Sequence, residues 1–100
     1  MELAIKIHSS YRNVVALADL DLVGKKFEQD KRQLDIRENF YQEKTITQEE
    51  AIQLLQQQAD QDSTFNIVGP KAIETAKQAG VISEANTCTV DNIPFALKLA

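Results

Sequence analysis

The beginning of the chain alternates between apolar and polar side chains, which is the period of a strand with one buried face. Its apolar positions are Leu3, Ile5 and Ile7. Residues 14–18 (Val-Val-Ala-Leu-Ala) are apolar throughout and predict a more buried strand. The polar residues between the two strands have the length of a hairpin connection, so residues 2–18 predict an opening β-hairpin.

A second, more exposed hairpin is predicted after a change of direction at residues 19–24. That stretch is typical of one short helical turn, which Gly24 can end in the left-handed conformation. Residues 25–28 and 32–36 then predict two short strands. Their inward-facing residues are Phe27, Leu34 and Ile36.

Two helices are predicted in the second half of the chain. The first covers residues 48–60, because Thr47 and Glu50 have the spacing of a capping box and apolar residues then recur every three or four positions. The second begins at Pro70, which suits the first helical position, and ends at Gly80.

Three further strands are predicted around the second helix. Residues 64–68 lead into this helix, and residues 87–90 follow it. Residues 93–99 alternate, but Pro94 cannot donate a ladder hydrogen bond. They therefore predict a terminal strand at the edge of the sheet.

This order of elements predicts one domain of the α+β class over residues 1–100. We expect a mixed or antiparallel sheet, made of the two N-terminal hairpins and the C-terminal strands, with the two main helices packed on it. A chain of 100 residues can bury one core. Its 43% hydrophobic and 26% charged residues are typical of a folded domain.

The sequence offers few residues for catalysis or metal binding. His8 and Cys88 are its only histidine and its only cysteine, whereas a zinc site needs several converging ligands and a hydrolytic triad needs a histidine beside its nucleophile. His8 falls on the polar side of the first strand, which favours a solvent-facing residue over a base. Acidic pairs such as Asp19 and Asp21 stand where helix caps are expected. We therefore predict no catalytic residue, no metal and no cofactor.

The overall charge is acidic, at −4 at pH 7, which argues against a protein whose main affinity is for phosphate backbones. No apolar run approaches the roughly 20 residues that span a bilayer, and the first residues lack the basic-then-apolar layout of a signal peptide. We therefore expect a cytoplasmic protein that does not bind membranes.

Cations nevertheless crowd one stretch of the chain. They are Lys25, Lys26, Lys31, Arg32 and Arg37, and Phe27, Phe40 and Tyr41 lie between or beside them. Rings that stack on bases and cations that hold phosphates are the ingredients of an RNA-binding surface. These cations and Tyr41 are thus one candidate surface for RNA or a protein partner. The alternative is a solubilising edge whose lysines face water, with Phe27 in the core.

A second candidate site lies where residues 64–68 lead through Gly69 into the second helix. A helix N-terminus presents unpaired N–H groups and a positive dipole end, which attract anions. Asn66, Gly69 and Lys71 would then hold a phosphate or a carboxylate. The alternative is an ordinary helix start, because Pro70 removes one donor and the turn lacks a glycine-rich phosphate-binding run.

Four short motifs follow one another along most of the chain. They are Leu22-Val23-Gly24-Lys25-Lys26-Phe27, Phe40-Tyr41, Asn66-Ile67-Val68-Gly69 with its alanine-rich helix ending at Gly80, and Ile93-Pro94. In this order they resemble the archaeal domain-of-unknown-function family 424 (DUF424). Gln42, Glu43 and Phe95 depart from that family's pattern, which often has glycines after the Phe-Tyr pair and a histidine after the proline.

The resemblance implies an archaeal cytosolic protein that is loosely associated with translation and RNA metabolism, and it carries over no catalytic residues. The favoured function is a non-enzymatic accessory or interaction domain that meets RNA or a translation-related protein. The alternative is a domain that binds a small anion, or an enzyme, with its site at Asn66, Gly69 and Lys71. A homodimer formed by pairing of the terminal edge strands also stays open.

Overall fold

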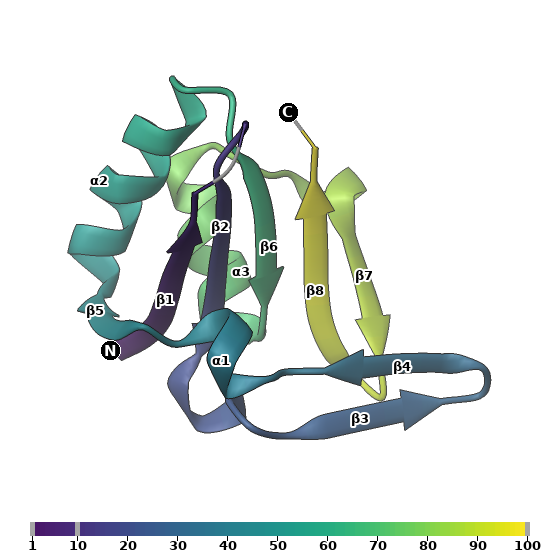
Figure 1. The fold of residues 1–100 in the computed structure, drawn as a ribbon. Coiled ribbons are helices and arrows are strands. Elements are labelled where there is room, and N and C mark those ends of the chain that lie inside the picture. The colour runs from purple at the N-terminus through teal and green to yellow at the C-terminus, as the bar shows by residue number, and fades with distance from the viewer. Residues whose placement is uncertain (1, 10, 100) are drawn as a thin grey trace.

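A computed structural model describes residues 2–9 and 11–99 (Figure 1). Its strands are β1 (Glu2–His8), β2 (Val14–Asp19), β3 (Lys26–Gln29), β4 (Arg32–Asp35), β5 (Lys44–Thr47), β6 (Thr64–Val68), β7 (Thr87–Val90) and β8 (Ile93–Lys98). Its helices are α1 (Glu38–Tyr41), α2 (Gln48–Ala59) and α3 (Pro70–Ala79), with short 3-10 turns η1 (Leu20–Leu22) and η2 (Glu84–Asn86).

Within these residues, six strands form one sheet in the order β5-β1-β2-β6-β8-β7. Neighbouring strands are antiparallel except β2 and β6, which are parallel. Because side chains alternate along a strand, Leu3 and Ile5 of β1 point to one face of the sheet. There they pack with Leu55 of α2 and Ile73 of α3 in the larger core. The structure confirms the predicted α+β class, with two main helices on a mixed sheet.

Both main helices begin and end close to the predicted residues. Thr47 Oγ1 accepts from the Glu50 N–H at 3.2 Å and Glu50 Oε1 accepts from the Thr47 N–H at 3.3 Å, which completes the predicted capping box of α2. Pro70 takes the first position of α3, and Gly80 ends it in the left-handed conformation with φ 78°. In the part of the chain that the structure describes, no helix is long and apolar enough to cross a membrane.

The other face of the sheet is covered by α1 and by the hairpin of β3 and β4, which runs across its lower end (Figure 1). The hairpin forms a two-stranded sheet of its own, whereas we expected it within the main sheet. This face of the sheet carries a second core, made of Ala16, Ala18, Leu22, Ile36, Tyr41 and Val68. Ile36 is fully buried in it, and Phe27 and Leu34 pack against it, as predicted. By lying on the sheet face, the hairpin brings these apolar side chains against the second core, whereas a hairpin that extended the edge of the sheet would leave them further from it.

The terminal strand is not at the edge of the sheet, so the prediction from Pro94 is wrong. β8 lies between β6 and β7, and β7 is the edge strand. In the antiparallel register, an N–H at position 94 would face the Gly69 oxygen, but that oxygen accepts from the Ile73 N–H at 2.9 Å. The Pro94 oxygen keeps its ladder bond, accepting from the Gly69 N–H at 2.8 Å. The start of α3 therefore supplies the hydrogen bond that proline cannot make.

Candidate functional site

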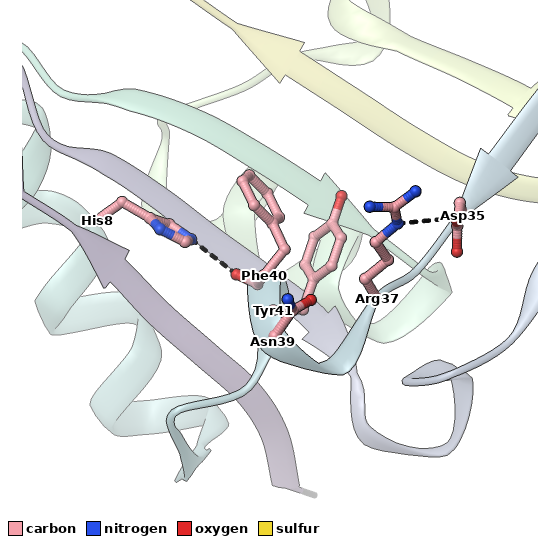
Figure 2. Close-up of a pocket in the computed structure, with 6 residues that line it drawn as sticks. All are labelled: His8, Asp35, Arg37, Asn39, Phe40 and Tyr41. Carbon is pink, nitrogen blue, oxygen red and sulfur yellow. Dashed lines mark hydrogen bonds and ion pairs between the residues drawn. The ribbon is translucent and has the colours of Figure 1, made fainter.

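An open depression of about 380 Å³ lies beside α1, on the sheet face opposite α2 and α3 (Figure 2). It is lined by His8, Asp35, Arg37, Asn39, Phe40 and Tyr41. Three of its residues carry rings, one carries a guanidinium group and one carries a carboxylate, so it combines apolar surface with one cation and one anion. Two of them, Arg37 and Tyr41, belong to the surface predicted from the sequence.

β1 holds α1 in place through two polar side chains. Lys6 and His8 alternate with the core residues of β1 and so face α1. Lys6 Nζ donates to the backbone carbonyl oxygen of Asn39 at 2.8 Å. His8 Nε2 lies 2.8 Å from the Phe40 oxygen, and because a carbonyl only accepts, Nε2 is the donor. These bonds satisfy carbonyls that a four-residue helix leaves unpaired.

The three rings of the depression form a chain of contacts, with Phe40 between His8 and Tyr41. His8 and Phe40 stack with ring centroids 4.5 Å apart and an interplanar angle of 26°. Phe40 and Tyr41 meet edge to face at 5.0 Å and 74°. Tyr41 is buried, and burial raises the pKa of its hydroxyl, so it is a neutral wall of the depression. Phe40 and His8 are half-buried and form the accessible part of the cluster.

Arg37 is the cation of the depression, and Asp35 is its anion. Its Nε lies 3.0 Å from Asp35 Oδ2, and the Arg37 side chain is 71% exposed. Figure 2 shows the guanidinium extending from the foot of α1 toward the end of β4. An exposed ion pair of this kind contributes at most about 1 kcal/mol, so the guanidinium can turn to another anion at little cost.

The remaining predicted cations lie on the β3–β4 hairpin and do not form one uniform surface. Lys26 pairs with Glu28 at 3.6 Å across exposed side chains. Arg32 Nη1 donates to the Thr89 oxygen of β7 at 3.4 Å and so faces the sheet. Lys25 and Lys31 are exposed.

The second predicted site, at the start of α3, is filled by a side chain of the protein itself. Asp19 Oδ1 accepts from the Ala72 N–H at 2.7 Å, and Asp19 Oδ2 accepts from the Lys71 N–H at 3.2 Å. The sequence predicted Asp19 as a cap of the turn at residues 19–24, but η1 has no side-chain cap hydrogen bond, and Asp19 instead caps α3. Burial raises the pKa of the Asp19 carboxyl above its usual 3.8, and the two backbone hydrogen bonds partly offset this.

Gly69 allows this close approach, whereas Asn66 lies elsewhere. A Cβ at position 69 would lie 2.5 Å from Asp19 Oδ1, and the φ of Gly69 is +105°. Asn66 lies between Phe65 and Ile67, which face the helix-side core, so it points to the opposite sheet face. Asn66, Gly69 and Lys71 therefore do not point their hydrogen-bond donors at one common site.

The surface predicted from the sequence left out four residues of the depression: His8, Asp35, Asn39 and Phe40, of which Phe40 was noted only as a neighbouring ring. His8 was assigned to solvent because it alternates with apolar residues, and that pattern gives no sign of α1 above it. Its distance of 32 residues from Phe40 makes the contact invisible to local spacing. Among the described residues, no group of three histidine, cysteine or acidic side chains is placed to hold a metal ion.

Comparisons with known proteins place the chain in a family. A crystal structure of an uncharacterized conserved protein from Methanopyrus kandleri is similar in fold, with a TM-score of 0.83 and 23% identity over 97% of this chain and 90% of that one. A search of curated proteins gave no similar sequence. The model of the family described as "Protein of unknown function (DUF424)" matches residues 7–99. The chain therefore belongs to the DUF424 family, as the sequence motifs indicated.

Proposed function

We propose that this protein is a non-enzymatic accessory domain of translation or RNA metabolism, acting in the cytoplasm, and that it binds RNA at the depression beside α1. One observation carries the proposal: an exposed guanidinium and a stacked pair of rings line the same open depression, at the foot of a hairpin that bears exposed lysines.

The chemistry of the depression suits RNA. Aromatic rings stack on unpaired bases, and arginine binds phosphate with a planar fork of donors. The hairpin leads away from α1 (Figure 1). Lys31 lies in the turn between β3 and β4, and Lys25 precedes β3, so these exposed lysines can offer phosphate contacts outside the depression. The net charge of −4 provides no overall attraction to nucleic acid, so binding would depend on this local group of cations.

The alternative, a small anion held at Asn66, Gly69 and Lys71, has less support. Its two N–H donors, on Lys71 and Ala72, already bind Asp19. A second anion beside this carboxylate would be repelled. An enzymatic role also has less support, because the Nε2 of the single histidine is engaged by the Phe40 oxygen.

The test is binding of fluorescently labelled RNA, followed by anisotropy at low salt. We expect Arg37→Gln to weaken binding about tenfold, because a charge-assisted contact to phosphate is lost. Arg32→Gln is the matched control, since it removes the same charge from a side chain that faces Thr89. Absence of RNA binding by the wild-type protein, or equal losses in both variants, would contradict the proposal.

The link to translation needs a separate experiment. The tagged protein would be captured from archaeal cell extract with and without ribonuclease, and the retained RNA and proteins identified. Ribosomal or initiation components that vanish on ribonuclease treatment are the expected result. A capture that retains only the protein itself would remove the link to translation while leaving direct RNA binding to the anisotropy test.

A further inference from the structure

We infer that the depression beside α1 holds a single unpaired nucleotide, so that the RNA ligand is a single strand or a loop and not a duplex. This inference rests on the proposed function and specifies its ligand. It follows from the size of the depression, from which of its rings are accessible, and from where its polar groups lie.

The size of the depression fits one nucleotide. Its volume of about 380 Å³ is at the lower end of the range of about 300–1,000 Å³ that is usual for small-ligand sites. A duplex keeps its bases stacked inside the helix and is recognised along its backbone over many base pairs. A recess of this size can instead admit one base that has left the stack.

The accessible ring surface is that of Phe40 and His8. Tyr41 is 8% exposed, so a base cannot stack on it, although its ring supports Phe40 edge to face. The half-buried Phe40–His8 stack offers a rigid apolar surface, because the His8 Nε2 bond to the Phe40 oxygen fixes the imidazole. A base that lies against this pair continues a stack that already exists.

Polar groups stand at the rim where a nucleotide needs them. Arg37 is exposed and weakly paired, so its guanidinium can exchange the Asp35 carboxylate for a phosphate. Asn39 is also exposed, and its amide offers both a donor and an acceptor to the edge of a base. One nucleotide would then contact ring, cation and amide together.

The first measurement uses the only histidine of the chain as a reporter. Its Cε1–H resonance would be followed by proton NMR during titration with a single-stranded RNA of about ten nucleotides, and then with the same sequence as a duplex. We expect the single strand to shift this resonance, because the ring current of a stacked base acts on His8. A duplex that shifts it equally, or a bound single strand that leaves it in place, would overturn the inference.

The second measurement compares Phe40→Leu with the wild-type protein. Leucine keeps an apolar side chain in the second core but removes the ring. We expect affinity for the single strand to fall about tenfold, with affinity for the duplex unchanged. Equal affinities of variant and wild type for the single strand would overturn the inference.

The two proposals fail in different ways. If the protein binds neither the single-stranded RNA nor the duplex, the proposed function and the inference are both wrong. If it binds RNA with dependence on Arg37 but prefers the duplex or ignores Phe40, RNA binding stands and only the single-nucleotide site is wrong.

Discussion

At the scale of single residues, Asp19 and Gly69 form the contact on which the centre of the fold depends. Asp19 is the last residue of β2, and its carboxylate accepts hydrogen bonds from the first turn of α3, more than fifty positions later in the chain. Gly69 makes this contact possible because any side chain there would collide with the carboxyl group. The sequence predicted that glycine opens the helix, and the structure adds that it also leaves room for Asp19.

Gly69→Ala should therefore lower the free energy of unfolding by about 3 kcal/mol, through a steric clash and a positive φ together. Gly24→Ala is the matched control: its φ is +89°, but the new methyl group would meet open space. Gly24→Ala should lower the free energy of unfolding by only about 1 kcal/mol. Urea unfolding of both variants measures the difference, and equal costs would show that Asp19 yields to the methyl group.

The raised pKa of Asp19 predicts a pH dependence of stability. Because the folded protein binds this proton more tightly than the unfolded chain does, the stability that Asp19 confers falls as the pH rises from the usual value of 3.8 through the raised folded pKa. Asp19→Asn cannot titrate and should lack this decline. Free energies of unfolding from about pH 3 to about pH 7 measure it, and parallel curves for the two proteins would refute the assignment.

At the scale of elements, the sequence predicted those whose signals lie within a few residues. α2 follows from a capping box and a helical stripe, and α3 follows from proline at its start and glycine at its end. α1 and β5 were not predicted, because the apolar residues of α1, Phe40 and Tyr41, are adjacent and β5 has only Ile46, so neither element displays a period. The position of β8 was predicted wrongly, because proline excludes a ladder bond but does not reveal that α3 replaces it.

The same limits apply to the candidate site. Arg37 and Tyr41 were predicted because basic and aromatic residues are close together in sequence. His8 was not predicted, because its contact with α1 depends on the tertiary arrangement that places α1 over β1. The anion site at Gly69 was predicted from the chemistry of helix ends, and no local signal shows that Asp19 binds there.

The capping box of α2 gives a prediction at this scale. Thr47→Ala removes the hydroxyl that accepts from the Glu50 N–H and should cost about 1 kcal/mol of stability. Thr45→Ala, at an exposed position of the same strand, is the control and should cost only a few tenths. Thermal or urea unfolding distinguishes them. If the two variants were equally stable, the box would contribute little beyond strand propensity.

At the scale of the whole molecule, charge is distributed unevenly. The chain carries 15 acidic and 11 basic residues, yet the depression and the hairpin present Arg37, Lys25 and Lys31 on exposed positions. Under the proposed function, such a surface would bind a short segment of RNA without drawing the entire protein to nucleic acid. The predicted route to a homodimer, pairing of the terminal strands, is wrong because β8 lies between β6 and β7. A homodimer by another surface and the cytoplasmic location stay predictions, and sedimentation would measure the oligomeric state.

The salt dependence of RNA binding should reflect this small number of cations. Three phosphate contacts on a single strand give a slope of about −2 in log affinity against log salt concentration, because each contributes about −0.7. Replacing Lys25, Lys31 or Arg37 by glutamine should each reduce the slope by about that amount. A much steeper slope in the wild-type protein would mean that other cations contact the RNA.

The carboxylate at the start of α3 also determines how that helix end exchanges its amide hydrogens with water. The first amides of a helix normally exchange fast, because no carbonyl of the same helix accepts from them. The amides of Lys71 and Ala72 are instead bonded to a buried side chain that is fixed at the end of β2. Their exchange should be slow and should follow the opening of the central sheet, so that a helix terminus reports on the most protected part of the molecule.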